Sequence, residues 1–350
     1  MGIGIIGTGY YVPSRILTNK ELESMVDTSD EWIFTKVGIR ERRIAGPHEA
    51  TSDLALKAAQ EALANAGVEP EEVDLIILAT SSPDMIQPAT AAIVQGKLGA
   101  LNSAAFDVSA VCAGFVYAMT VASAMMQANP QYRRAVVIGA ETYSRILDWT
   151  DRTTCVYFGD GAGAVVLGQQ AGDLGIQKTF LKNDGRGAGA IRYLGGGSRH
   201  PASPETLAQK MHRFEMNGRE VWNFATTACP LSVRQVVQDA GIQLSDIDWI
   251  IVHQANINII RHSLDELGIP LEKTYTTIEK YANTAGASLP ITLAEAHAKN
   301  LFRKGDKIVL VGFGGGLSLG AVYLNWGMDY AGGQKALVQQ PAVVGDWQKN

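Results

Sequence analysis

Apolar residues recur in two kinds of segment along the chain. LALKAAQEALANAG (54–67) and LSVRQVVQDAG (231–241) have helical spacing, and each ends at a glycine of the type that closes helices. A short acidic loop follows each one and leads into an apolar run, VDLII (73–77) or IDWII (247–251), that is typical of a buried strand. The pattern predicts an α/β fold in which helices cover buried sheets.

The two sets of segments repeat. Ala66 and Ala240 hold matching positions 174 residues apart, and AVVIGAE (135–141) is similar to IVLVGFG (308–314) at an offset of 173. Coincidence explains one such pair, but two pairs at nearly one offset favour duplication. We therefore expect two similar halves, each alternating strands with helices.

The repeat sets the expected division of the chain. We predict an N-terminal half at 1–170, a C-terminal half at 171–326 and an extension of unknown role at 327–350. A segment rich in Gly, Ser and Pro (182–207) lies early in the second half. It is long for a connection, so we expect it to be either functional or mobile.

Composition and charge remove several classes of function. The net charge of −5 and the lack of a basic stripe argue against nucleic-acid binding. Cysteines at positions 112, 155 and 229 form no pairing pattern, which suits a reducing compartment. We find no signal peptide and expect no membrane-spanning run, so the sequence predicts a cytoplasmic protein.

Two glycine-containing motifs are interpreted as chance matches. GIGIIG (2–7) has almost nothing before it, whereas dinucleotide binding needs a strand before the glycines and a helix after them. GLSLG (316–320) is similar to the elbow of serine hydrolases, which needs a histidine later in the chain, but the last histidine is His297. The sequence has no P-loop lysine motif and no HExxH motif, and we expect no metal site.

Cys112 lies in DVSAVCAGFVYAM (107–119), where small and apolar residues precede the thiol and a helix-like run follows it. If that helix begins near Cys112, its free N–H groups favour a thiolate there. They also favour an oxyanion on a bound carbonyl. Buried cysteines are common and inert, so this stretch alone leaves a nucleophile and a packed core cysteine equally open.

Two further polar residues stand in small or apolar surroundings. His253 follows the strand-like run WIIV (249–252), at the kind of strand end where α/β proteins place ligand-binding groups. Asn283 lies in YANTAGASLP (281–290), a loop of small residues before an apolar helix. A structural histidine and simple turn chemistry are the alternatives. Together with a thiol, these groups suggest acyl-thioester chemistry, and no papain-like cysteine signature is present.

Longer motifs give the chain a family resemblance. Over about 1–326 it resembles the thiolase-like condensing enzymes, specifically β-ketoacyl-acyl carrier protein synthase III. The motifs that carry the resemblance are IIGTGYYVP, VDTSDEWIFTKVGIRERRIA, FDVSAVCAGFVYA, TDRTTCVYFGDGAGAVVL, HQANINII, YANTAGASLP and GFGGGLSLGA. The resemblance implies a duplicated five-layered α-β-α-β-α fold, which agrees with the repeat.

The resemblance implies a decarboxylating condensation that uses acyl-CoA and malonyl-acyl carrier protein as substrates and no cofactor. Cys112 would take the acyl group, and malonyl decarboxylation would give an enolate that attacks the acyl thioester. His253 and Asn283 would stabilise the enolate. Backbone N–H groups of Cys112 and of the glycine loop around Gly315 would hold the other oxyanion, with Phe313 in the cavity wall.

The resemblance also implies a site for CoA. Trp32 and Arg152 match a pair that sandwiches adenine by stacking and cation–π contact. Lys36 stands where many relatives have arginine, which keeps the positive charge but loses the bidentate fork. Asn256 matches a residue of the CoA tunnel.

The expected contacts with the acidic carrier protein are Gln254, Asn258 and Arg261. Asn258 replaces a common arginine, and Arg261 partly compensates on a surface that needs positive charge. Gln87 lies where some relatives bring a phenylalanine across a homodimer into the acyl pocket. We therefore expect a primer that is longer than acetyl or branched.

A second hypothesis remains open beside condensation. A related acyltransferase would form the same acyl-enzyme at Cys112 but pass the acyl group to a different acceptor in specialised metabolism. A biosynthetic thiolase fits less well because it needs a second catalytic cysteine, and Cys155 and Cys229 are interpreted as structural. A degenerate, non-catalytic subunit would have lost the Cys, His and Asn that this chain keeps.

Overall fold

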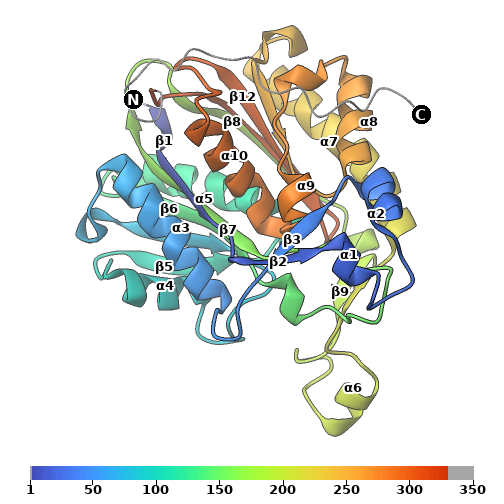
Figure 1. The fold of residues 1–350 in the computed structure, drawn as a ribbon. Coiled ribbons are helices and arrows are strands. Elements are labelled where there is room, and N and C mark those ends of the chain that lie inside the picture. The colour runs from blue at the N-terminus through green and yellow to red at the C-terminus, as the bar shows by residue number, and fades with distance from the viewer. Residues whose placement is uncertain (1, 330–350) are drawn as a thin grey trace.

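The computed structural model describes residues 2–329, so most of the predicted extension at 327–350 lies outside the described residues. Two main sheets are stacked together with helices (Figure 1). The first sheet has the strand order β1-β7-β6-β4-β5, in which β4 runs parallel to β5 and β6. Its strands are β1 (Gly2–Tyr11), β4 (Leu75–Ala79), β5 (Ala104–Val108), β6 (Ala135–Glu141) and β7 (Gly161–Gln170).

The second sheet repeats this arrangement with the order β11-β12-β13-β8. Its strands are β8 (Gly175–Asn183), β11 (Trp249–Val252), β12 (Lys307–Gly314) and β13 (Ser318–Asn325). β11 runs parallel to β12, as β4 does to β6, and β13 is antiparallel to β12, as β7 is to β6. The segment pairs matched in the sequence thus hold equivalent places in the two sheets, and the predicted duplication is confirmed.

The predicted helix ends are also confirmed. α3 (Thr51–Ala66) closes at Gly67 with φ of 62°, and α7 (Gly218–Ala240) closes at Gly241 with φ of 67°. Glycine adopts this left-handed conformation without the steric cost of a Cβ. α7 begins well before the segment predicted from position 231 and continues through Pro230, which the periodicity had placed outside the helix.

Helices form three layers around the two sheets. α5 (Gly114–Ala128) and α10 (Ser288–Ala298) pack between the sheets. α3 and α4 (Thr90–Leu98) cover the outer face of the first sheet, and α7 and α8 (Ile257–Leu267) cover that of the second. The five-layered α-β-α-β-α fold is therefore confirmed.

One core helix has the length and composition of a membrane span. The segment Val111–Ala128 is long and apolar enough to cross a membrane by composition, although the sequence analysis expected no such run. In the fold this segment is α5 with the turn before it, and Phe115 and Met119 are fully buried between the sheets. Packing on both sides by sheets explains its apolar character.

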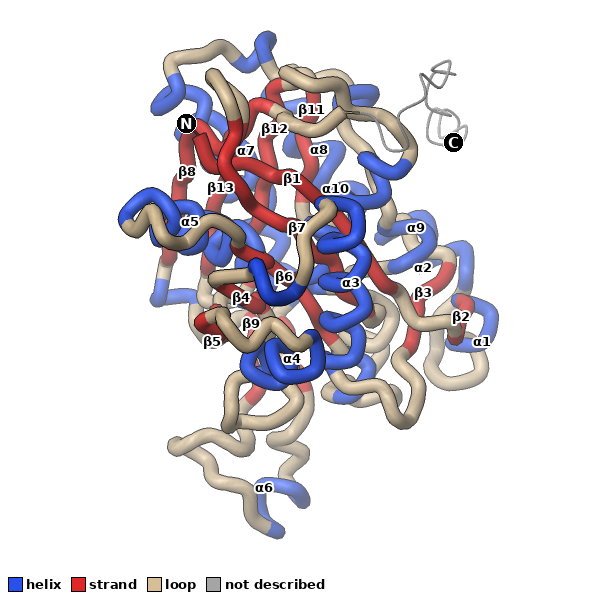
Figure 2. The backbone as a smooth tube through the Cα atoms, turned by 90° about the vertical axis from the view of Figure 1, so that its left-hand side faces the viewer, coloured by secondary structure: helices blue, strands red, loops and turns tan. Residues whose placement is uncertain are grey.

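Smaller elements flank the two sheets. β2 (Arg15–Thr18) pairs with β3 (Glu41–Ile44), and β9 (Ile191–Tyr193) pairs with β10 (Phe214–Met216). The short helices are α1 (Asn19–Leu22), α2 (Asp30–Val37), α6 (Pro204–Ala208) and α9 (Ile278–Tyr281). The segment with α6 projects from the body of the protein in Figure 1 and in Figure 2.

Candidate active site

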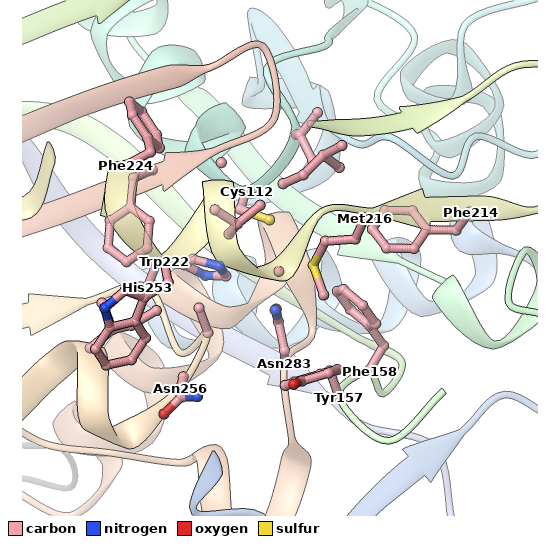
Figure 3. Close-up of a pocket in the computed structure, with 18 of the residues that line it drawn as sticks. Cys112, Tyr157, Phe158, Phe214, Met216, Trp222, Phe224, His253, Asn256 and Asn283 are labelled. Carbon is pink, nitrogen blue, oxygen red and sulfur yellow. The ribbon is translucent and has the colours of Figure 1, made fainter. Parts of the chain in front are cut away.

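Cys112, His253 and Asn283 line one cavity of about 160 Å³ (Figure 3). Cys112 precedes α5, His253 follows β11 and Asn283 follows α9, so the fold brings together three segments that are far apart in the chain. The rest of the lining is mainly apolar, and it includes Tyr143, Phe158, Ile191, Phe214, Met216, Trp222 and Phe313. Ile191 comes from the Gly-rich segment at 182–207, which supports the functional interpretation of that segment.

A strained turn presents Cys112. Val111 has φ of 48°, a conformation that is a genuine outlier for a β-branched residue. The turn Val111–Ala113 is a 3₁₀ helix that leads directly into α5, so Cys112 lies at the predicted helix start. Such strain persists where the surrounding structure enforces it, commonly at functional sites.

The expectation of a stabilised thiolate at Cys112 is not supported. Burial, and then the nearby carboxyl group of Glu141, raise the pKa of the Cys112 thiol well above its usual range. The N–H groups at the start of α5 act in the opposite direction, but desolvation outweighs them. Cys112 is therefore a protonated thiol near neutral pH.

Glu141 is a buried carboxyl group that the sequence analysis missed. It ends β6, and it accepts hydrogen bonds from the Ser81 N–H at 3.1 Å, the Ser81 hydroxyl at 2.9 Å and the Gly286 N–H at 3.4 Å. Burial raises the pKa of Glu141 to about 7. The carboxyl group thus ties the loop after β4 to the loop of Asn283. A charged residue at the end of the apolar run AVVIGAE was the available signal.

His253 is buried, with 1% of its surface exposed. Its Nδ1 lies 2.6 Å from the Ser288 hydroxyl, and its ring packs edge-on against Phe313 at 5.3 Å. Burial lowers the pKa of His253 to about 3, so the imidazole is neutral near neutral pH. Because Nδ1 contacts the Ser288 hydroxyl, Nε2 is the ring nitrogen that remains to form hydrogen bonds in the cavity.

Asn283 has its side chain oriented by its own loop. Its Oδ1 accepts a hydrogen bond from the Ala285 N–H at 2.8 Å. With the oxygen held in this way, the Nδ2 donors point into the cavity (Figure 3). The turn hydrogen bond that was the alternative explanation for Asn283 is present, and it orients the side-chain amide toward the cavity.

Aromatic side chains form the wall beside Cys112. Tyr143 is 1% exposed, stacks on Phe158 at 4.8 Å and contacts Phe214 edge-on at 5.3 Å. The Tyr143 hydroxyl lies 2.9 Å from the Ser81 hydroxyl. Residues from β10 and from the loop after β6 meet only in the folded chain, so no sequence pattern could predict this wall.

Phe313 and the glycines after it lie against Cys112. Phe313 and Gly314 line the cavity, as expected of Phe313, whereas Gly315 packs beside Val111 and Ile191. A Cβ on Gly314 would lie 2.8 Å from the Cys112 Cβ and 2.9 Å from its backbone nitrogen. Only glycine fits so close to the thiol-bearing residue.

A Gly314→Ala variant is expected to lower the rate of Cys112 acylation about 100-fold, because its methyl group displaces the thiol and misplacement of about 1 Å costs this much. Acyl-CoA uptake followed by intact mass measures the effect. Gly197→Ala is the matched control, since nothing lies within 4 Å of a Cβ at that exposed position. Equal acylation rates in the two variants would contradict the close approach.

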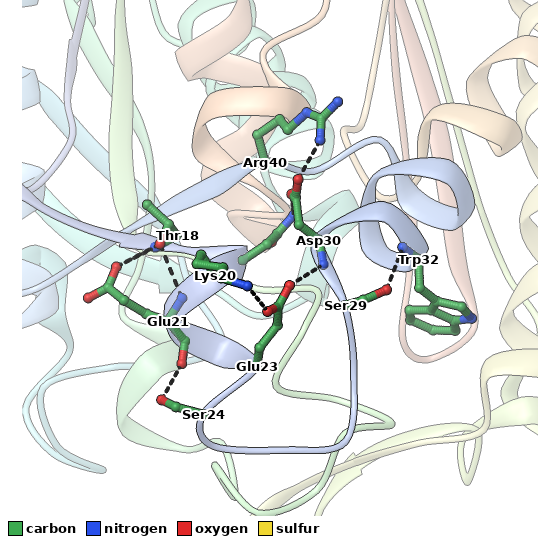
Figure 4. Close-up of polar contacts among 10 residues, drawn as sticks. Thr18, Lys20, Glu21, Glu23, Ser24, Ser29, Asp30, Trp32 and Arg40 are labelled. Atoms are coloured by element: carbon green, nitrogen blue, oxygen red, sulfur yellow. Dashed lines mark hydrogen bonds and ion pairs between the residues drawn. The ribbon is translucent and has the colours of Figure 1, made fainter.

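Trp32 and Arg152 lie together at the surface, with the guanidinium carbon 5.0 Å from the centre of the indole. Trp32 lies in α2, whose start is fixed because the Ser29 hydroxyl accepts from the Trp32 N–H at 3.1 Å (Figure 4). Asp30, the first residue of α2, forms an ion pair with Arg40 at 2.6 Å. Two stacking contacts need about 7 Å, so Arg152 must move for an adenine to fit between the pair.

Lys36 is exposed near the end of α2, and its backbone carbonyl joins α2 to α8. Both the Asn256 and the Asn258 side-chain amides donate to this carbonyl, at 3.1 and 3.0 Å. Asn256 also lines the cavity, so it lies between the site of Cys112 and α2. Its predicted position in a tunnel is consistent with this placement.

The remaining predicted residues lie in different surroundings. Gln254 is fully buried, and its Oε1 accepts from the Thr277 N–H at 2.9 Å, so its side chain does not reach a surface where a carrier protein binds. That prediction does not fit the structure. Arg261 is half-buried on α8, and Gln87 is exposed in the loop before α4, outside the cavity of its own chain.

Within residues 2–329, no group of three or more His, Cys, Asp or Glu is placed to hold a metal ion.

Comparisons with known proteins agree on one family. The family model "3-oxoacyl-[acyl-carrier-protein] synthase III" matches residues 106–185, and the model of its C-terminal part matches residues 237–326. β-Ketoacyl-[acyl-carrier-protein] synthase III of Symbiobacterium thermophilum is 51% identical over 93% of this chain and 98% of its own. The protein of that name from Caldanaerobacter subterraneus is 48% identical over 92% and 97%. The crystal structure of 3-oxoacyl-[acyl-carrier-protein] synthase III from Aquifex aeolicus has a TM-score of 0.85 at 42% identity, over 93% of this chain and all of that one.

Proposed function

Because the chain belongs to the 3-oxoacyl-[acyl-carrier-protein] synthase III family, we propose that it condenses an acyl-CoA primer with malonyl-acyl carrier protein in fatty acid biosynthesis. The products are 3-oxoacyl-acyl carrier protein, CO2 and CoA. The observation that carries the assignment of residues is the convergence of Cys112, His253 and Asn283 on one cavity. Every bond change comes from the thiol, the substrates and hydrogen-bond donors, so the proposal includes no cofactor.

The first step is acyl transfer to Cys112. The sulfur attacks the thioester carbon of acyl-CoA, the bond from that carbon to the CoA sulfur breaks, and the thiol proton leaves with CoA. Backbone N–H groups of Cys112 and Gly315 hold the oxyanion during attack. The raised pKa of the thiol means that deprotonation accompanies attack rather than preceding it.

The second step is decarboxylation and carbon–carbon bond formation. Malonyl-acyl carrier protein loses CO2, and its thioester carbonyl becomes an enolate held by N–H groups of His253 and Asn283. The enolate carbon attacks the acyl group, the bond to the Cys112 sulfur breaks, and the thiolate takes up a proton. Both donors are neutral and fixed in place, so they favour the developing charge without reorganising.

We propose that acyl-CoA enters along the surface beside α2. We assign the adenine to Trp32 and Arg152, the phosphates to Lys36 and the pantetheine arm to the passage beside Asn256. Asn258 and Arg261 are the remaining candidates for carrier contact on α8. This assignment rests on the family resemblance, and the contact of Asn256 with the cavity and with the Lys36 carbonyl agrees with it.

We further propose a homodimer in the cytoplasm. β5 is one of the two edge strands of the first sheet, and nearby Ile86 and Leu101 are 78% and 73% exposed. An unpaired edge flanked by apolar side chains favours pairing with a second copy. Gln87 adjoins Ile86, so it would face the partner through this contact. Three free cysteines suit a reducing compartment.

Tyr143 bears on primer length more directly than Gln87 does. A Tyr143→Leu variant is expected to raise acylation by octanoyl-CoA relative to acetyl-CoA about tenfold, because a smaller side chain opens the wall beside Cys112. Tyr143→Phe keeps the ring and is expected to keep the wild-type ratio. Competition between the two acyl-CoAs, followed by intact mass, measures it. An unchanged ratio in Tyr143→Leu would remove Tyr143 from the acyl pocket. The longer primer inferred from Gln87 stays a prediction.

The function is tested by supplying acyl-CoA and malonyl-acyl carrier protein and following CO2 and carrier-bound product. We expect 3-oxoacyl-carrier protein and CO2 in equal amounts. An acyl-enzyme that forms but never turns over with malonyl-carrier protein would favour transfer to a different acceptor instead.

A further inference from the structure

We propose that Ser288 is a positioning residue that fixes the His253 ring in the tautomer whose N–H faces the cavity. The inference rests on the proposed function, because it explains how His253 becomes a hydrogen-bond donor. It concerns a residue at the first position of α10, which no part of the mechanism above uses.

The contacts of Ser288 are few and specific. Its hydroxyl is buried with the residue 1% exposed, and it lies 2.6 Å from His253 Nδ1. The Gln254 N–H donates to the same oxygen at 3.2 Å. Among residues 2–329, the hydroxyl has no other hydrogen-bond partner.

A count of the hydrogen-bond donors and acceptors then selects one tautomer of His253. A serine hydroxyl has one hydrogen to donate and two lone pairs. If the hydroxyl donates to Nδ1, the ring proton sits on Nε2 and every group in the cluster is paired. If Nδ1–H donates to the hydroxyl, the serine hydrogen is left buried without an acceptor, which is costly. The first arrangement is the favoured one.

The favoured tautomer matches the chemistry that the cavity needs. Nε2 carries the proton and is the nitrogen left to face the cavity lined by His253. Asn283 is aimed in a comparable way, since the Ala285 N–H holds its oxygen and leaves Nδ2 as donor. Each donor is thus oriented by a separate partner outside the reacting atoms.

The backbone contact gives Ser288 a second use. Gln254 follows His253, and its N–H reaches the serine oxygen that binds the ring. The hydroxyl therefore holds both the backbone just after β11 and the imidazole, which limits rotation of the ring. The loss of this hydroxyl frees the tautomer and the ring together.

The test uses the full chain with ¹⁵N-labelled histidine. In wild type, the ¹⁵N shifts of His253, identified by their absence in His253→Gln, are expected to show a protonated Nε2 and an unprotonated Nδ1. In Ser288→Ala, the two nitrogens are expected to become mixed in character. A wild-type ring protonated on Nδ1, or an unchanged pattern in Ser288→Ala, overturns the proposal.

Kinetics give the second readout. Ser288→Ala is expected to lower the rate of malonyl decarboxylation about 10- to 100-fold, less than loss of an oxyanion donor, and to leave Cys112 acylation within about threefold. Ser288→Thr retains a hydroxyl and is expected to restore most of the decarboxylation rate. Decarboxylation at the wild-type rate in Ser288→Ala would overturn the positioning role.

Thr292→Val is the matched control for a purely structural effect. Thr292 lies one turn along α10, is fully buried, and its hydroxyl contacts Thr277 and the Ser288 carbonyl. Its loss is expected to lower stability while leaving the His253 shifts and both rates unchanged. A matching loss of decarboxylation in Thr292→Val would mean that damage to α10, not the serine hydroxyl, causes the effect. Should His253→Gln itself decarboxylate normally, the proposed role of His253 fails and not merely that of Ser288.

Discussion

A Cys112→Ala variant is expected to take up no acyl group from acyl-CoA, whereas the wild-type chain gains the mass of one acyl group. Cys112 is the thiol that lines the cavity, and alanine offers no atom to form the thioester. Condensation is expected to fall by at least about 1,000-fold, as it does when a covalent nucleophile is removed. Intact mass after incubation with acyl-CoA measures the adduct directly.

The two other thiols supply matched controls for this experiment. Cys155 and Cys229 are also free and buried, but they pack in separate clusters away from the cavity. Cys155→Ala and Cys229→Ala are expected to keep the full adduct. An adduct on Cys112→Ala would contradict the assignment of Cys112 as the nucleophile. Loss of the adduct from Cys155→Ala or Cys229→Ala would contradict it as well.

His253→Ala and Asn283→Ala are each expected to slow malonyl decarboxylation about 100- to 1,000-fold, the usual effect of losing one oxyanion donor. Acylation of Cys112 is expected to stay within about threefold, because the acyl-CoA oxyanion uses backbone N–H groups. Burial lowers the pKa of His253 to about 3, so its protonation gives no loss of decarboxylation between about pH 5 and 8. Separate assays of acylation and CO2 release measure the split.

A finer variant separates the donor role of Asn283 from its packing. Asn283→Asp keeps an oxygen that accepts from the Ala285 N–H but replaces the Nδ2 donors with a second acceptor. Its decarboxylation is expected to be at least as slow as that of Asn283→Ala. If any of these variants lost acylation while it kept decarboxylation, the division of roles would be wrong.

Local rules predicted the repeat and the ends of its helices. Gly67 and Gly241 close equivalent helices because a left-handed residue suits glycine, and this preference acts within a few residues of chain. The strands at 73–77 and 247–251 were visible because burial on both faces makes them continuously apolar. The start of α7 was not predicted, since the helix begins at Gly218 and continues through Pro230, where tertiary packing overrides the propensity of proline to end a helix.

The site was predicted in part. Cys112, His253 and Asn283 stand out in the sequence as polar residues among small or apolar ones. Tyr143 and Ser288 contact partners that are distant in the chain, Ser81 and His253, so no spacing rule could reveal them. Glu141 was missed although a charged residue at the end of the apolar run AVVIGAE marks it in the sequence. The carrier contact assigned to Gln254 was wrong because the side chain turns inward to Thr277.

A single-turnover experiment on isolated acyl-enzyme tests the central claim most directly. Cys112 is first acylated, free acyl-CoA is removed, and malonyl-acyl carrier protein is added while the masses of both proteins and the released CO2 are followed. The proposed function predicts that the Cys112 adduct disappears in step with CO2 release and that the same acyl group appears in 3-oxoacyl-carrier protein. Release of CO2 while the adduct persists, or loss of the adduct without a carrier-bound product, would contradict it.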